Sequence, residues 1–170
     1  GYSSAASDVY KRQLSGEPNA RIVLHGVSMG AATVLMASGE DLPENVKVVI
    51  ADCGYTSEWD EFQREADTLH IPWFPVLNAT SVLSKVRDGY DFKQASALAQ
   101  VKKSRIPTLF IHGSSDELVP YSMLGELYAA AACEKEELTV EGAGHALSSS
   151  VAPTLYWRTV EDFIAKYLDR

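Results

Sequence analysis

One serine in this sequence stands where a chain can expose a nucleophile. The segment GVSMG places Ser28 two residues after Gly26 and two before Gly30. An apolar run at 22–24 precedes the segment and an alanine-rich run at 31–37 follows it, which predicts a strand and then a helix. A strand that turns directly into a helix brings the two glycines close to neighbouring backbone, where a β-carbon would clash. The segment therefore predicts a nucleophilic serine, lifted clear of the sheet at a sharp turn.

A serine hydroxyl is a weak nucleophile unless a histidine accepts its proton and an acid fixes the tautomer of that histidine. His145 lies in the glycine-rich loop EGAGHA, after the last predicted strand. Loops of this kind build the sites of open α/β sheets, so we expect His145 to be the base. We expect His25 beside the sheet, His112 hydrogen-bonded in the core, and His70 in a helical segment where it could line a pocket.

Two aspartates are candidates for the acid, because each follows a predicted strand. Asp116 lies in HGSSDELVP and Asp52 in IADCGY, and either one gives the chain order serine, acid, histidine. We favour Asp116, because Pro120 can begin the next helix and fix the loop. Asp52 is then expected to be a carboxylate that caps the turn after its strand.

The helix that follows the serine directs its positive end towards the predicted site. The backbone N–H of Met29 is accordingly expected to donate to a developing oxyanion. Trp59, Trp73 and Phe74 are candidates for an apolar substrate pocket, with Val119 near its rim. Packing of a small helical layer on the sheet is the alternative role of the three aromatic residues. No spacing of Cys and His indicates a ligand set, so we expect neither a metal nor a cofactor.

Apolar and β-branched runs predict the elements that must position these residues. The predicted strands cover 22–25, 46–51, 108–112 and 137–140. The predicted helices cover 28–38, 121–133 and 155–167, and 56–103 is a longer, irregular helical stretch. Alternation of strand and helix implies an α/β fold with a parallel sheet and right-handed crossovers. The candidate residues are expected at the carboxyl ends of its strands.

Composition bounds the kind of protein and its partners. The 170 residues suit one domain, and 46% hydrophobic against 22% charged residues predicts a globular core. The net charge of −8 argues against nucleic acid or an anionic membrane as partner, since both require clustered Lys and Arg. No apolar run reaches the roughly 18 residues of a membrane helix, and no signal peptide is recognised. Cys53 and Cys133 lie far apart, which indicates free thiols and a cytoplasmic protein.

The first residues of the sequence differ in character from the rest. Residues 3–13, SSAASDVYKRQ, resemble a translated sequencing adapter and fit no element pattern. We therefore expect 1–13 to be a non-native or disordered tail, and the folded domain to cover 14–170.

From Arg21 to its end, the chain resembles the α/β-hydrolase superfamily, and most closely bacterial serine hydrolases of the serine aminopeptidase-like type. The segments GVSMG, PTLFIHGSSDELVP and GAGHA carry the resemblance. It implies a catalytic triad of Ser28, Asp116 and His145. It also implies that 56–103 is a helical insert that covers the active site as a cap.

The resemblance has a limit at the first strand. The family sheet has eight strands, and this chain supplies only the last four, so a partial α/β-hydrolase domain is expected. The early His-Gly loop that gives the second oxyanion N–H has no counterpart before Ile22. The implied activity is acyl transfer to water on a small-molecule acyl substrate, foremost by a carboxylesterase. A peptidase or acyltransferase on the same triad, and an inactive truncated fragment, are the alternatives.

Overall fold

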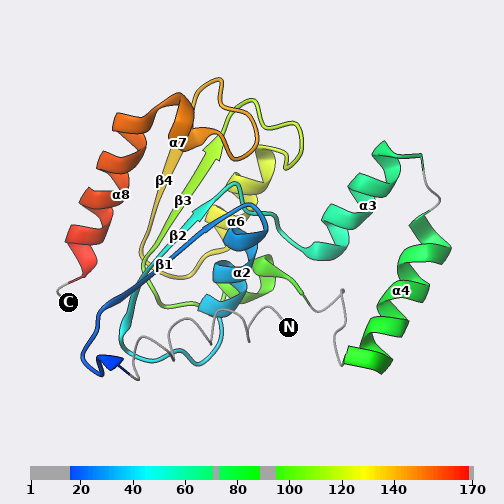
Figure 1. Ribbon diagram of the computed structural model, residues 1–170, viewed down its shortest axis with the longest axis horizontal. Coiled ribbons are helices and arrows are strands. Elements are labelled where there is room, and N and C mark those ends of the chain that lie inside the picture. The colour runs from blue at the N-terminus through cyan, green and yellow to red at the C-terminus, as the bar shows by residue number, and fades with distance from the viewer. Residues whose placement is uncertain (1–15, 71–72, 89–94, 169–170) are drawn as a thin grey trace.

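Four parallel strands form the central sheet of the protein, which Figure 1 shows as a computed structural model. The structure describes residues 16–70, 73–88 and 95–168, so the predicted tail at 1–13 lies outside the described residues. The strands are hydrogen-bonded in the order β1-β2-β3-β4. They are β1 (Ile22–Val27), β2 (Val46–Asp52), β3 (Thr108–Gly113) and β4 (Lys135–Val140). The predicted parallel α/β fold is confirmed.

Helices cover the two faces of the sheet. In Figure 1, α8 lies on one side of the strands, and α2 and α6 lie on the other. The helices are α2 (Met29–Ser38), α3 (Glu58–Thr68), α4 (Trp73–Asp88), α5 (Ala97–Val101), α6 (Ser122–Ala130), α7 (Ser148–Val151) and α8 (Pro153–Tyr167).

The strand β2 shows how the two layers share the core. Val48 and Ile50 are fully buried and belong to the cluster that contains Phe163 of α8. Val49 and Ala51 point to the other face and belong to the cluster formed with α2, α5 and α6. Each buried aliphatic side chain contributes about 1.5–3 kcal/mol to folding. Burial on both faces explains why this strand is a continuous apolar run rather than an alternating one.

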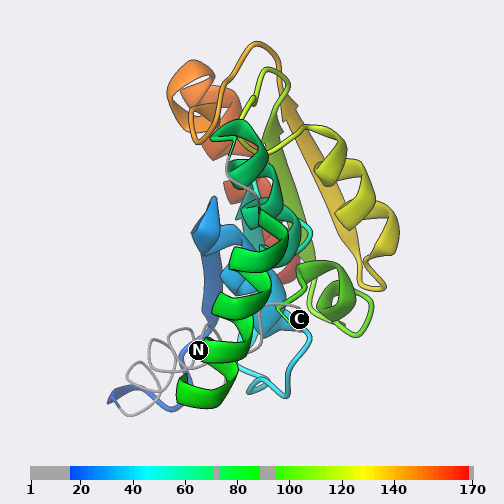
Figure 2. The same cartoon turned by 90° about the vertical axis from the view of Figure 1, so that its right-hand side faces the viewer.

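The stretch predicted as a helical insert contains an excursion from the sheet. The views in Figures 1 and 2 show α3 and α4 to one side of the strands, whereas α5 returns and packs against α2. The outgoing and returning chains are joined where they pass: Ser57 bridges Ser96, and Leu98 N donates to the Thr56 carbonyl at 3.0 Å. That this excursion caps the site stays a prediction.

Candidate active site

Ser28 occupies the turn between β1 and α2. Its backbone has φ 56° and ψ −119°, a conformation that costs an L-residue about 1–3 kcal/mol. Its N–H donates to the Asp52 carbonyl at 2.8 Å, which ties the turn to β2. A serine just before a helix ordinarily caps it with its hydroxyl. The Ser28 hydroxyl makes no such bond and is directed to His145 instead.

The two glycines that flank the serine have different environments. A β-carbon added to Gly26 would overlap the carbonyl of Gly30, so the predicted close approach is present there. A β-carbon added to Gly30 would meet no atom within 4 Å, and the predicted clash at that position is wrong. Gly30 lies in the first turn of α2, where an added β-carbon would enter open space.

Ser28 and Asp116 contact opposite nitrogens of the His145 ring. Ser28 Oγ lies 2.7 Å from Nε2, and Nδ1 lies 2.9 Å from Asp116 Oδ2. Because a carboxylate can only accept, Nδ1 carries the proton and Nε2 accepts from the serine hydroxyl. The three side chains follow β1, β3 and β4, whose carboxyl ends share one edge of the sheet. Such an arrangement can deprotonate a serine during nucleophilic attack.

The Asp116 carboxylate is held from several sides. Its side chain is fully buried, and Oδ1 accepts the backbone N–H groups of Leu118 and Val119 at 3.0 and 2.9 Å. His112 Nε2 lies 3.3 Å from Oδ2 and donates to the Val119 carbonyl at 3.0 Å. These bonds leave Oδ2 directed at His145 and fix the plane of the carboxylate.

Direct contacts join the acid loop to the histidine loop. A β-carbon on Gly113 would overlap the Ala143 carbonyl, which also accepts Ser115 N at 3.0 Å. The Ser114 hydroxyl donates to Glu141 Oε2 at 2.9 Å. It also accepts the backbone N–H of Gly142 at 2.9 Å. These contacts hold the two loops against each other.

Asp52, the other candidate acid, has different partners. Its side chain is 1% exposed and accepts the Ser148 hydroxyl at 3.1 Å on Oδ1, with a further hydrogen bond to Tyr156. Burial raises the pKa of Asp52, and the hydrogen bonds oppose part of that rise. The predicted role as a turn cap is replaced by one that joins β2 to α7 and α8. His145 takes Asp116 as its partner.

A thiol lies close to this centre. Cys53 is 1% exposed, and burial raises the pKa of its thiol to about 12. Its sulfur, an Asp116 oxygen and a His145 nitrogen lie within 4.8 Å of one another, and among the described residues they form the one group with metal-ligand chemistry. A thiol ligand must be deprotonated, and the raised pKa opposes that. Cys53 and Cys133 are both free, as predicted.

The remaining histidines have partners other than the serine. His25 Nε2 is 3.0 Å from the Tyr156 hydroxyl, and its ring also contacts Trp157 edge-on. His112 is buried in the core as predicted. His70 is exposed at the turn after α3.

A pocket of about 160 Å³ opens beside Ser28. Met29, at the first position of α2, and Val119, 1% exposed, both contribute to it. Of the predicted aromatic residues, Trp59 is half-buried outside the lining and Phe74 is 70% exposed on α4. The side chain of Trp73 lies outside the described residues.

Sequence reasoning missed five of the residues that line this pocket: Tyr55 and Leu118 in loops, and Glu58, Glu61 and Phe62 on α3. Phe62 supplies the aromatic wall that was expected from the tryptophans, and the carboxyl-bearing residues Glu58 and Glu61 line the same pocket. Acidic residues in a first helical turn ordinarily stabilise the helix dipole, so their types carry no signal of a site.

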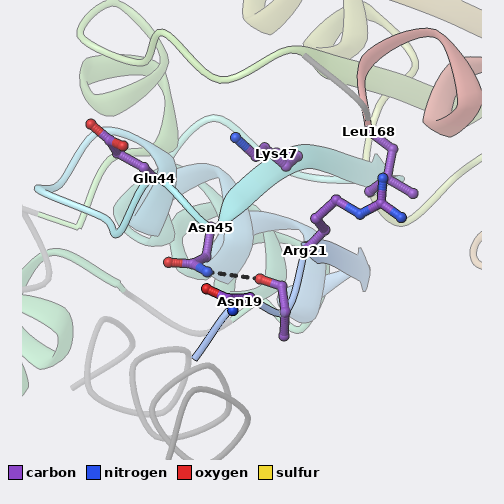
Figure 3. Close-up of a pocket in the computed structure, with 7 residues that line it drawn as sticks. Asn19, Arg21, Glu44, Asn45, Lys47 and Leu168 are labelled. Carbon is purple, nitrogen blue, oxygen red and sulfur yellow. Dashed lines mark hydrogen bonds between the residues drawn. The ribbon is translucent and has the colours of Figure 1, made fainter. Parts of the chain in front are cut away.

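A second hollow, of about 380 Å³, lies at the opposite edge of the sheet (Figure 3). Asn45 Nδ2 donates there to the Ala20 carbonyl at 2.8 Å, beside Arg21, Glu44 and Lys47. These residues lie at the amino ends of β1 and β2. The serine, the histidine and both aspartates lie at the carboxyl ends, so the smaller pocket is the candidate site.

The sequence of the chain resembles that of one described protein family over almost its whole length. A profile of the prolyl oligopeptidase family matches residues 7–170. The chain belongs to the prolyl oligopeptidase family. It is 32% identical over 146 residues to the "Uncharacterized protein YqkD" of Bacillus subtilis, covering 84% of this chain and 47% of that protein. It is 31% identical over 156 residues to the "Alpha/beta hydrolase domain-containing protein WAV2" of Arabidopsis thaliana, covering 86% and 47%.

Solved structures show the same fold. The Pyrococcus furiosus esterase Pf2001 has a TM-score of 0.73 at 20% identity, over 96% of this chain and 61% of that one. The Pyrococcus horikoshii acylaminoacyl peptidase has a TM-score of 0.70 at 17% identity, over 94% and 26%. These likenesses confirm the α/β-hydrolase fold. The chain spans about half the length of the curated relatives it matches, from 41% to 47%.

A last property concerns the lengths and the polarity of the helices. Across the described ranges, every helix is too short or too polar to cross a bilayer.

Proposed function

We propose that this protein is a serine hydrolase that cleaves an ester, thioester or amide through an acyl-enzyme, foremost as a carboxylesterase. The observation that carries the proposal is the pair of contacts on His145: 2.7 Å to the Ser28 hydroxyl and 2.9 Å to the Asp116 carboxylate. The family and the fold, both of hydrolase type, support it.

The proposed reaction has two acyl-transfer steps. His145 Nε2 takes the proton of Ser28 as Oγ forms a bond to the substrate carbonyl carbon. The Met29 N–H and the positive end of α2 stabilise the oxyanion. His145 then gives the proton to the leaving group as the scissile bond breaks. Water, deprotonated by the same nitrogen, releases the acid from Ser28, and Asp116 stabilises the imidazolium in both steps.

A fluorophosphonate probe tests the proposal on the purified protein. Ser28 Oγ should form a bond to phosphorus with loss of fluoride, and mass spectrometry should locate the adduct on Ser28. The Ser28→Ala variant should lose the adduct and about 10⁴-fold or more of kcat/KM towards p-nitrophenyl butyrate. Ser122→Ala, an exposed serine at the start of α6, is the matched control and should retain both. A folded sample with neither adduct nor turnover would contradict the proposal and support the inactive alternative.

A peptidase is the second candidate, and the family description favours it. The two candidate functions differ in the leaving group, which is an alcohol for an esterase and an amine for a peptidase. An amide is cleaved only when its leaving nitrogen is well protonated. Measuring kcat/KM for an ester and an amide of the same acyl group decides between them. Amide turnover within about tenfold of ester turnover would favour the peptidase.

A further inference from the structure

One peptide group of the acid loop, residues 114–119, is hydrogen-bonded on both of its sides. This loop follows β3 and carries Asp116. The carbonyl oxygen of the peptide that joins Leu118 to Val119 accepts a bond from the Arg64 guanidinium at 2.8 Å. The N–H of the same peptide donates to Asp116 Oδ1 at 2.9 Å. One peptide therefore lies between a cation of α3 and the candidate acid.

The planarity of this peptide makes the two bonds interdependent. The peptide is trans, so its C=O and its N–H point in opposite directions and cannot rotate independently. A rotation that turned the carbonyl away from Arg64 would also turn the N–H away from Asp116. The bond to Arg64 therefore fixes the direction in which this N–H donates.

The charge of Arg64 strengthens the same bond. An arginine side chain is permanently cationic, and hydrogen bonds from a charged group are about twice as strong as neutral ones. Nη1 of Arg64 is shielded from solvent and the side chain is half-buried, so water screens the charge only in part. A cation on the carbonyl oxygen polarises the peptide, and bonds in such a chain strengthen one another by about 10–30%. The N–H of Val119 is thereby a stronger donor to Asp116.

Arg64 belongs to the excursion, whereas the other partners of the acid belong to the sheet and its loops. The N–H of Leu118 comes from the acid loop itself, and His112, 3.3 Å from Asp116 Oδ2, comes from β3. Arg64 lies in α3, 54 residues before the carbonyl that it contacts. The position of α3 is thus linked to the acid through a single peptide.

We infer that Arg64 is a positioning residue for the proposed catalytic acid. Acting through the peptide that follows Leu118, it directs the Asp116 carboxylate at His145. A well-directed carboxylate keeps the ring proton on Nδ1 and leaves Nε2 able to accept from Ser28. The effect on rate rests on the proposed function, whereas the tautomer of His145 is measurable without turnover.

A direct contact with the substrate is the alternative role of Arg64. Arg64 and Leu118 both line a pocket of about 320 Å³, which shares Leu118 and Glu61 with the pocket beside Ser28. A long acyl group that reaches this second pocket would meet the guanidinium. An acetyl group on Ser28 occupies only the first pocket, whose lining does not include Arg64. The length of the acyl group therefore separates the two roles.

Nitrogen NMR of the His145 ring tests the inference on the purified, isotope-labelled protein. Ring nitrogen shifts, recorded above the pH at which the ring stops titrating, report which nitrogen carries the proton, and His145→Gln identifies the signals. In Arg64→Met the proton fraction on Nδ1 should fall towards that of Asp116→Asn, the reference without a carboxylate. Arg64→Lys keeps a cationic donor and should stay nearer to the wild type. Arg158→Met, the same class of change at an exposed arginine of α8, is the matched control and should leave the tautomer unchanged.

Enzyme kinetics measure the consequence for the reaction. In Arg64→Met, kcat/KM towards p-nitrophenyl acetate should fall about tenfold, because a small displacement of a catalytic group can cost up to about a hundredfold in rate. The fall towards p-nitrophenyl octanoate should be the same, since both esters depend on the same acid. Arg64→Lys should recover most of the loss, and Arg158→Met should match the wild type.

The possible outcomes are distinguishable. An unchanged tautomer in folded Arg64→Met overturns the inference, and so does a loss of turnover confined to the octanoate. If thermal unfolding shows that Arg64→Met does not fold, Arg64→Gln repeats both measurements with a neutral polar side chain. Absence of fluorophosphonate labelling of Ser28 in the wild type overturns the proposed function, and the tautomer measurement then still decides the role of Arg64.

Discussion

Two buried groups near His145 have different partners. Asp116 accepts two backbone N–H groups and contacts the His145 ring. Burial raises the pKa of the Cys53 thiol, and the negative charges of Asp52 and Asp116 raise it further. A reactive thiolate beside the serine is thereby avoided.

Cysteine alkylation tests this residue-scale difference. In the folded protein at pH 8, iodoacetamide should modify Cys133 and leave Cys53 intact. With a pKa of about 12, the thiolate fraction of Cys53 is on the order of one in ten thousand, and its side chain is 1% exposed. Peptide mass spectrometry measures both sites. In guanidinium chloride the two cysteines should react equally, and equal rates in the folded protein would contradict the prediction.

At the scale of the elements, the turn from β1 to α2 depends on one glycine more than on the other. The Gly26 hydrogen faces the Gly30 carbonyl with no room for a methyl group, whereas Gly30 faces open space. The two positions of the motif, equivalent by sequence, thus have opposite expected responses to alanine.

Gly26→Ala should lower the free energy of unfolding by about 3 kcal/mol or more, because the added methyl group must displace backbone. Gly30→Ala is its matched control and should be neutral or stabilising by up to about 1 kcal/mol, from the higher helix propensity of alanine. Urea denaturation measures both. Similar losses in the two variants would contradict the different packing of the two positions.

The elements that the sequence predicted well are those defined by burial on both sides. The run at 46–51 has no polar face, and β2 extends only one residue beyond it. The ends of helices were less predictable from the sequence. The helix predicted to reach Cys133 stops at Ala130, because Ala131 adopts an extended conformation with ψ 130°. The four-residue helix α7 is too short to give any apolar period.

The candidate site likewise contains residues that the sequence predicts and contacts that it does not. Motif spacing and chain order predicted that Ser28, Asp116 and His145 belong together, and they lie within hydrogen-bonding distance; their catalytic roles stay predictions. Glu58 could not be predicted as a pocket residue, because its distance from Ser28 depends on the direction in which α3 leaves the sheet. The partner of Asp52, Ser148, is 96 residues away, and no local pattern encodes that contact.

At the scale of the whole molecule, Asp52 connects segments from both ends of the chain. Its carbonyl accepts the N–H of Ser28, and its carboxyl group accepts Ser148 and contacts Tyr156. The elbow, the segment after His145 and α8 thus meet at one buried side chain. A change at Asp52 is expected to alter the stability of the fold as well as the geometry of the site.

The stabilising effect of Asp52 should decline as pH rises. Burial raises its pKa in the folded state, so the unfolded chain loses this proton first and binds fewer protons in the interval between the two pKa values. Stability then falls as pH passes upwards through that interval. Asp52→Asn carries no such proton, so the wild-type advantage in unfolding free energy should be smaller at pH 8 than at pH 4. Urea denaturation at both pH values measures it.

The matched control for this prediction is Asp162→Asn. Its carboxylate is exposed on α8, 3.8 Å from the Arg158 guanidinium, and has almost no desolvation to lose on unfolding. Its difference from wild type should change little between the two pH values. A wild-type advantage that grows with pH at Asp52 would contradict the prediction.

The bridge between Ser57 and Ser96 marks the point where the excursion leaves the sheet and returns to it. The loops of the sheet carry Ser28, Asp116 and His145. The excursion, whose two ends are neighbours, carries three other residues of the pocket, Glu58, Glu61 and Phe62. An excursion with adjoining ends can be exchanged for one of another length, because the entropic cost of closing a loop grows only slowly with its number of residues. Under the proposed function, substrate selectivity is then separable from the groups that react, so a graft across this junction that retains the contact of α3 with the acid loop should transfer selectivity while Ser28, Asp116 and His145 keep their positions.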